Sequence, residues 1–232
     1  MNDSEKRRYE MFVRVRDFGA AHAGDFAATS LGKQLFTTIG TVVSELDSHS
    51  SSKTSGVGTA RQGTATRASA RSAVREDIEG INRTARAMAD EIKGIGDRFR
   101  MPRSENDQLL LSTARSFATD VEPFSAQFIA HELSPDFIAE LQADIAAMET
   151  AISSQSSGIG DHIAAGAAID DAIDRGVSIV RKLGAIIKNK YGDNPAVLAE
   201  WTSVSHTERS PKRRSAPTPP PPPTIPSPGA TT

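Results

Sequence analysis

Apolar residues recur every three or four positions along most of this chain, which is the spacing of one face of an α-helix. Residues 3–22 form the first such stretch, and Asp3 or Ser4 can cap a helix there. A second stretch begins near Ser30, and the stripe resumes after a Ser-rich segment at 48–55. Its apolar positions are Leu31, Leu35, Ile39, Val42, Val43, Leu46, Val74, Ile78, Ile81, Ala85 and Met88. Since the sequence has no runs of alternating β-branched residues, the pattern predicts an all-α protein.

The chain repeats this plan at a fixed offset. Residues 51–58 read SSKTSGVG, and residues 153–160 read SSQSSGIG, 102 positions later. The same offset relates apolar positions on both sides of the phrase: Leu35, Ile39, Val43 and Leu46 correspond to Phe137, Leu141, Ile145 and Met148, and Ile78 and Ile81 correspond to Val180 and Leu183. A self-match at a fixed offset predicts two copies of one structural unit.

The predicted fold is an up-and-down helical bundle with two internally repeated helical units, made of two long helices and two shorter ones. Repeat unit one is expected at residues 3–96, repeat unit two at 104–192, and a short capping helix at 195–206. Together they make a bundle over residues 1–206. The remaining residues, 207–232, hold nine of the chain's 13 prolines and are expected to form a disordered tail of polyproline II character.

The repeated phrase leaves two alternatives for the path of the chain. Its glycines are Gly56 and Gly58 in the first copy and Gly158 and Gly160 in the second. They are either turns or interior positions of two long helices, each roughly 55 to 65 residues and on the order of 90 Å long. Glycine disfavours a helix interior by about 1 kcal/mol relative to alanine, but small residues also allow two helices to cross closely.

The phase of the second apolar stripe favours the continuous alternative. Its isoleucines recur every seven residues through the phrase, and one more continues the same face: Ile138, Ile145, Ile152, Ile159 and Ile163. We therefore interpret the four glycines chiefly as helix-crossing positions, where the helices run on or kink.

Composition narrows the class of protein. Aromatic residues make up only 5% of the chain, which suits helices packed through small side chains better than a β-sandwich. Cysteine is missing from the sequence, which excludes disulfides, thiolate chemistry and cysteine metal sites. The N-terminus has no apolar stretch typical of a secretory signal, and no run of about 18 apolar residues predicts a membrane span. We expect a soluble, cytoplasmic protein that does not insert into a membrane.

Charge is distributed unevenly, although the formal net charge is only −2. Residues 53–103 contain eleven Lys or Arg and six Asp or Glu residues. Residues 104–174 contain one Arg and thirteen Asp or Glu residues. Neighbouring segments of opposite sign predict helices that face each other, so a nucleic-acid surface is not expected. Two periodic sets are the candidates for this pairing: Arg67, Arg71 and Arg75 on one side, and Asp136, Glu140 and Asp144 on the other.

Motifs that carry chemistry are missing from the sequence. The histidines do not occur in HExxH or ExxH, and the chain has no GxSxG and no Walker A phrase. The GVG and GIG triplets lack the strand–turn–helix context of a phosphate-binding loop. We therefore predict no catalytic, cofactor-binding or metal-binding residues, and the chain is more typical of a non-enzyme. The alternative is a bundle that senses a small molecule or metal near the paired glycines, where His49 and His162 could approach each other.

The segment 191–210, YGDNPAVLAEWTSVSHTERS, and the phrase SSGIGDHIAAGAAID resemble a group of bacterial proteins of unknown function. The resemblance covers most of residues 10–210 and implies a helical bundle in a bacterial cell. No functional residue follows from it. We predict a role in protein–protein interaction or scaffolding, through an exposed helical face and through Pro219–Pro223, a minimal ligand for aromatic-lined grooves.

Overall fold

The computed structural model describes residues 1–103 and 106–208. The prediction of an all-α protein is confirmed, because the described residues form helices and no strand. They contain seven α-helices: α1 (Asp3–Ala21), α2 (Leu31–Ala87), α3 (Ile95–Arg98), α4 (Asp107–Asp120), α5 (Ser125–Ala130), α6 (Phe137–Lys190) and α7 (Pro195–Val204). The short helices α3 and α5 are additions to the two long and two shorter helices predicted for the repeated units.

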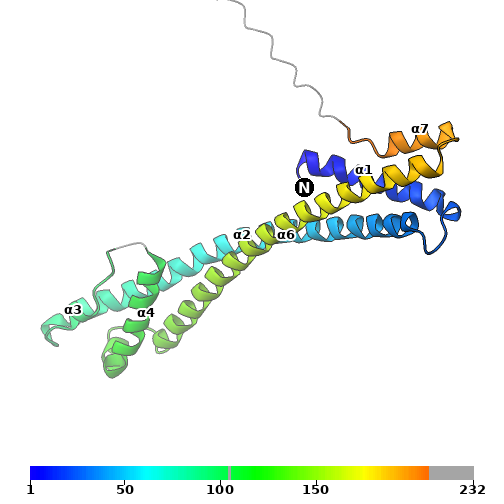
Figure 1. Ribbon diagram of the computed structural model, residues 1–232. Coiled ribbons are helices and arrows are strands. Elements are labelled where there is room, and N and C mark those ends of the chain that lie inside the picture. Colours follow the sequence, from blue (N-terminus) through cyan, green and yellow to red (C-terminus); the bar gives the residue numbers. More distant parts are fainter. Residues whose placement is uncertain (104–105, 209–232) are drawn as a thin grey trace, which may run out of the picture.

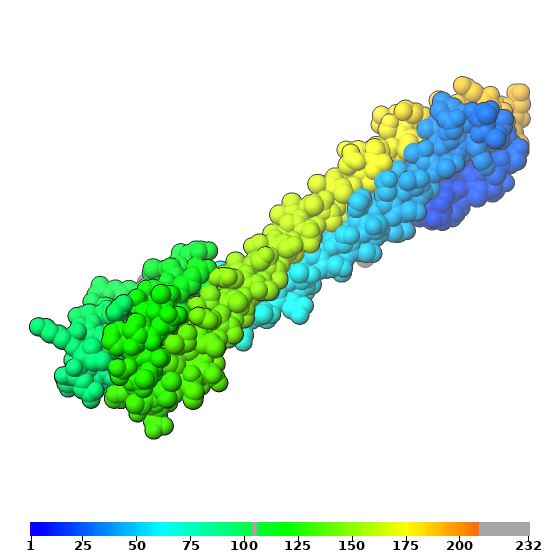
Figure 2. All heavy atoms as spheres, turned by 90° about the horizontal axis from the view of Figure 1, so that it is seen from below, coloured from blue at the N-terminus to red at the C-terminus, as the bar shows by residue number. Residues whose placement is uncertain are grey.

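Two long helices dominate the molecule (Figure 1). Helix α2 has 57 residues and α6 has 54, and both run unbroken through the repeated phrase. The glycines are thus interior helical positions rather than turns. The helices are antiparallel, because Gly56 lies opposite Gly158 while Gly63, further along α2, lies opposite Gln155, earlier in α6. Figures 1 and 2 show an elongated molecule with bulk at both ends and a narrow middle.

One end, called the α1 head here, is formed by α1 and α7 packed on the start of α2 and the end of α6. The ring of Phe12 on α1 lies directly over Gly176 of α6, where a Cβ would come within 2.5 Å of it. Phe36 of α2 meets Gly19 of α1 in the same way. The core of this head includes Met11, Phe12, Val15, Phe18, Ile39, Val42, Val43, Leu46, Ile169, Ile173, Leu183, Ile187 and Trp201.

The opposite end, the α4 head, has a separate core formed by α3, α4 and α5 on the end of α2 and the start of α6. Its aromatic centre is Phe99, whose ring meets those of Phe117 and Phe128 edge-on at 5.2 and 5.6 Å between centroids. Edge-on aromatic pairs of this kind stabilise a core beyond the apolar area that they bury, and they favour one packing geometry. Because the two cores share no residue, the molecule is two small helical heads joined by the long helices.

Between the heads lies the waist, defined here as residues 47–69 of α2 and 149–168 of α6. Its buried residues are all small: Gly56, Gly63, Ala151, Gly158 and Ala165. No third helix covers this stretch among the described residues (Figure 1). The waist therefore buries little apolar area, and α2 and α6 hold together there by close backbone contact.

Two segments border on residues that the structure does not describe. The Pro-rich tail, including Pro219–Pro223, lies outside the described residues from residue 209 onward. The Asn106 side chain caps α4 by accepting from the backbone N–H of Gln108 and Leu109.

The start of α2 gives a first test of the local structure. Ser30 caps this helix, and its hydroxyl accepts from the backbone N–H of Lys33 at 3.2 Å. We expect Ser30→Ala to lower the free energy of unfolding by about 1 kcal/mol, because that N–H loses its partner. Ser30→Asp retains an acceptor, so chemical denaturation should find it close to the wild type. Equal losses from both substitutions would contradict a capping role.

Candidate functional site

The centre of the waist is a backbone-to-backbone contact made by Gly56 and Gly158. A Cβ on Gly56 would lie 2.8 Å from the amide nitrogen of His162, and one on Gly158 would lie 2.6 Å from that of Ala60. Each would also come within about 3 Å of the other glycine's carbonyl oxygen, at 3.0 and 2.9 Å. Because Cβ atoms essentially never approach backbone that closely, only glycine fits at these two positions.

The other two predicted crossing positions lie elsewhere. Gly58 and Gly160 are exposed, and a Cβ on either would meet nothing within 4 Å. Gly63 was not among the predicted crossing positions, yet a Cβ added there would lie 2.8 Å from the Cα of Gln155. The signal that could have found it is the seven-residue spacing from Gly56, since that spacing keeps both residues on one helix face.

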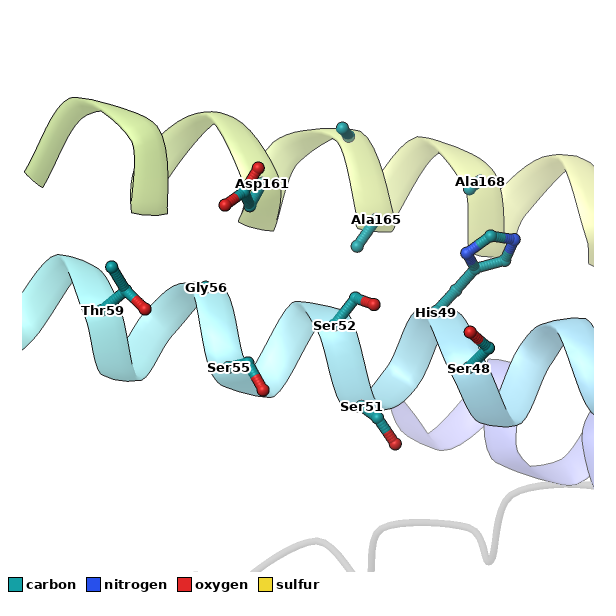
Figure 3. Close-up of a pocket in the computed structure, with 11 residues that line it drawn as sticks. Ser48, His49, Ser51, Ser52, Ser55, Gly56, Thr59, Asp161, Ala165 and Ala168 are labelled. Atoms are coloured by element: carbon teal, nitrogen blue, oxygen red, sulfur yellow. The ribbon is translucent and has the colours of Figure 1, made fainter. Parts of the chain in front are cut away.

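A groove opens beside this contact, on the side of the waist drawn in Figure 3. Its first half has a volume of about 630 Å³, and α2 lines it mainly with hydroxyl groups, including those of Ser48, Ser52 and Ser55. Helix α6 contributes Asp161 and three alanines. Figure 3 places His49 beside Ala168, at the other end of the half-groove from Asp161. The lining therefore consists of small side chains, with hydroxyl groups on α2 and mostly alanines on α6, and its two ionisable side chains lie apart.

The second half of the groove has a volume of about 520 Å³ and shares Thr59 with the first. Its lining residues Thr59, Gln62, Gly63 and Thr66 precede Asp161, Ala164, Ala165 and Ala168 of the first half by 102 positions each. On the facing helix, Thr150, Ala151 and Ser154 follow Ser48, His49 and Ser52 by the same offset. The two halves thus form one long shallow groove that crosses the Gly56–Gly158 contact.

The opposite side of the waist differs in character. Gln155 bridges the helices there, since its amide donates to Thr64 Oγ1 at 2.8 Å and its oxygen accepts from Arg67 at 2.7 Å. Ile159 and Ile163 of α6 are 47% and 64% exposed. The prediction that these two isoleucines continue the buried stripe is wrong, because the crossing at Gly158 turns that face of α6 outward.

The predicted arginine stripe finds a different acidic partner. Arg67 and Arg71 both pair with Asp107 of α4, at 2.6 and 3.3 Å. Arg75 pairs with Glu79 on its own helix at 2.9 Å. Helix α2 is therefore linked by charge to the second unit, but through α4 rather than through the predicted face of α6. The short helix α4 crosses that part of α2 in the α4 head, which the sequence could not indicate.

The predicted acidic face of α6 instead meets another carboxyl group. Glu140 and Asp144 lie near Asp77 of α2, whose Oδ2 is buried without a hydrogen-bond partner among the described residues. Burial is the main cause that raises the pKa of Asp77, to about 6. Repulsion from Asp144 and a hydrogen bond to it add to this shift, and the charges of Glu140 and Glu76 contribute less. Two facing carboxyl groups of this kind disfavour the ionised pair.

These arrangements offer hydrogen bonding rather than a reaction centre. His49 lines the groove, whereas Nδ1 of His162 lies 3.3 Å from the carbonyl oxygen of Lys53, so the two histidines do not form one site. Within residues 1–103 and 106–208, no group of three His, Asp or Glu side chains is placed to hold a metal ion. A long groove lined by hydroxyl groups and alanines can offer both hydrogen bonds and small apolar contacts along its length.

Comparison of the chain with protein-family models, with curated proteins and with solved structures finds no match in any of the three. The resemblance to bacterial proteins therefore stays a prediction. None of the helices in the described ranges combines the length and apolar character that a membrane crossing needs.

Proposed function

We propose that this protein is a non-enzymatic helical scaffold that binds a protein partner along its waist. One observation carries the proposal: two separately cored heads are joined by two helices that no further helix covers over about 20 residues. A helix in a protein gains most of its stability from packing against other elements. A stretch of α2 and α6 with only each other as support has both flanks open to a partner.

We also infer that the scaffold consists of two copies of one unit related by a pseudo-twofold axis through the waist. Gly56 meets His162, and Gly158 meets Ala60; each member of the first pair lies 102 positions from a member of the second. The order of helices supports the same relation, since α1 precedes α2 as α4 precedes α6. A twofold axis at that point makes each half of the groove the counterpart of the other.

The shape of the groove favours a protein partner over a small molecule. Its two halves share Thr59 and together extend along both helices, so a helix or an extended peptide could follow them. The alternative, a sensor of a small molecule near the paired glycines, draws on the polar lining by His49, Asp161 and the serines. Pockets for small ligands are usually more enclosed than this groove.

A photo-reactive amino acid placed in the groove tests the proposal. Ser52 and Ser154 line the two halves and are 102 positions apart, whereas Thr54 is exposed on α2 outside the groove. We expect irradiation of cells producing the protein to give the same protein adduct from positions 52 and 154. Position 54 serves as the matched control and should give little of it.

The outcome separates the alternatives. An adduct from both groove positions supports a partner that follows the groove. Absence of an adduct from both of them, or an equal yield from the control position, would overturn the proposal. A small-molecule sensor would also leave the groove positions without a protein adduct, so that result would favour the alternative.

A further inference from the structure

A second pocket lies away from the waist, in the α1 head, where α1, α6 and the segment after α7 meet. Its volume is about 570 Å³. Arg7 and Arg8 from the second turn of α1 line one wall, and Arg181 of α6 lines another. Apolar atoms of Met11 and Val177 also contribute to the lining. Three arginines from two helices thus line one depression.

These three arginines lack the carboxylate partner that seven other arginines of the described residues have. Among the described residues, no Asp or Glu oxygen lies within ion-pair distance of Arg7, Arg8 or Arg181. By contrast, seven arginines of the described residues pair with a carboxylate: Arg16, Arg67, Arg71, Arg75, Arg98, Arg115 and Arg175. Like charges brought to one pocket repel each other, and a bound anion would remove that cost.

Few other groups that line the pocket are free to donate a hydrogen bond to a ligand. The Ser205 hydroxyl already donates to the carbonyl oxygen of Trp201 at 2.7 Å, and that of Thr207 donates to Met11 Sδ at 3.2 Å. Ser4 also lines the pocket, and its hydroxyl has no such bond among the described residues. Glu208 also lines the pocket and is exposed, and no ion pair joins it to the three arginines among the described residues. The free donors are therefore chiefly the guanidinium groups.

We propose that this pocket binds a small soluble ligand that carries two or more phosphate groups. Guanidinium groups present paired N–H donors that match the oxygens of a phosphate, and they stay charged at any physiological pH. Three of them supply more positive charge than one carboxylate would need. A ligand with several phosphates fits both the charge and the size of the pocket.

The corresponding place in the other head does not have this chemistry. By the offset of 102, Leu109 and Leu110 stand where Arg7 and Arg8 do, and Glu79 stands where Arg181 does. Glu79 is paired with Arg75. The pocket is thus a feature of one head, and the inference does not depend on a partner at the waist.

Isothermal titration of the full-length chain with tripolyphosphate, at about 10 mM ionic strength, tests the proposal. At that salt concentration charge interactions extend about 30 Å. We expect the wild type to bind, and Arg7→Gln/Arg181→Gln to lose at least about tenfold in affinity. Without tripolyphosphate, this variant should melt at the same temperature as the wild type or higher, because mutual repulsion is removed.

Two control variants keep the result specific. Arg86→Gln/Arg100→Gln removes the same charge from a pocket of the α4 head, lined also by Asp97, and should leave the affinity unchanged. Lys212→Gln/Arg213→Gln/Arg214→Gln removes a basic run outside the described residues and should also bind. Failure of the wild type to bind, or an equal loss in either control, would overturn the proposal.

Discussion

The substitution Gly158→Ala is expected to destabilise the protein by about 2 kcal/mol or more, whereas Gly160→Ala, two residues away on the same helix, is expected to stabilise it. At position 158 the new Cβ would lie 2.6 Å from the amide nitrogen of Ala60 and 2.9 Å from the carbonyl oxygen of Gly56. Both are backbone atoms of α2, so the helices would have to move apart.

Position 160 is the control for this comparison, because it lies on the same helix and lacks the close contact. It is exposed, and a Cβ there meets nothing within 4 Å. In such a place alanine is favoured over glycine by about 0.5–1 kcal/mol, because the unfolded chain loses freedom and the helix interior gains propensity. The two substitutions have the same chemistry and are expected to have opposite signs. Thermal melts followed by circular dichroism, with amide hydrogen exchange at the waist, would measure both.

The first copy should behave in the same way. Gly56→Ala places a Cβ 2.8 Å from the amide nitrogen of His162, and Gly58→Ala places one in open space. If the substitutions at 158 and 160 shift the free energy of unfolding in the same direction, Gly158 does not contact the backbone of α2 as closely as described. If the second copy shows the difference and the first does not, the two helices cross differently from what the pseudo-twofold relation requires.

The same glycines show how far the sequence could predict this fold. The all-α class and the two long helices follow from apolar spacing that continues past the phrase at 153–160. Which glycine of each pair meets the other helix did not follow, because Gly56 and Gly58 differ by 200° around a helix and the sequence has no reference for the partner's direction. Ile159 illustrates the limit, since its spacing fits the core and its side chain is 47% exposed.

The charge pattern of the sequence also predicted the pairing of helices only in part. A basic segment followed by an acidic one predicted that the two units would face each other, and Arg67 does pair with the second unit. Its partner Asp107 belongs to the short helix α4, whose position depends on a turn containing Pro123 and on the packing of Phe128 into the α4 head. The arginine pocket was missed for the same reason, because its walls are α1 and α6, distant in sequence.

The carboxyl group of Asp77 makes the α4 head sensitive to pH. Its pKa in the folded protein is about 6, above the value of about 4 for an unfolded chain. The folded state therefore holds this proton more tightly, and the stability it contributes is complete below about pH 4 and is lost as the pH rises to about 6. The groups that face it are Asp144, Glu140 and Glu76, all acidic.

The size of this effect is modest because the side chain is partly solvated. The full shift would correspond to about 3 kcal/mol at 1.36 kcal/mol per unit, and solvent screening reduces that to about 1 kcal/mol. Asp120 should show the opposite slope, since a hydrogen bond from Arg98 at 3.0 Å holds its pKa below the usual range. Asp120→Asn is thus a control that removes stability at neutral pH and leaves the Asp77 slope in place.

The α1 head supplies an apolar replacement for the acidic pair. By the offset of 102, Ile179 corresponds to Asp77 and Val42 to Asp144, and both are buried in that head's core. We expect Asp77→Ile/Asp144→Val to raise the free energy of unfolding at pH 7.5 by about 2 kcal/mol, because packed apolar residues replace two repelling carboxyl groups. Urea denaturation from pH 4 to pH 7.5 would also show that stability no longer falls across this range. A double variant less stable than the wild type at pH 7.5 would mean that the two heads pack differently at these positions, and a slope that persists would assign the pH dependence to other groups.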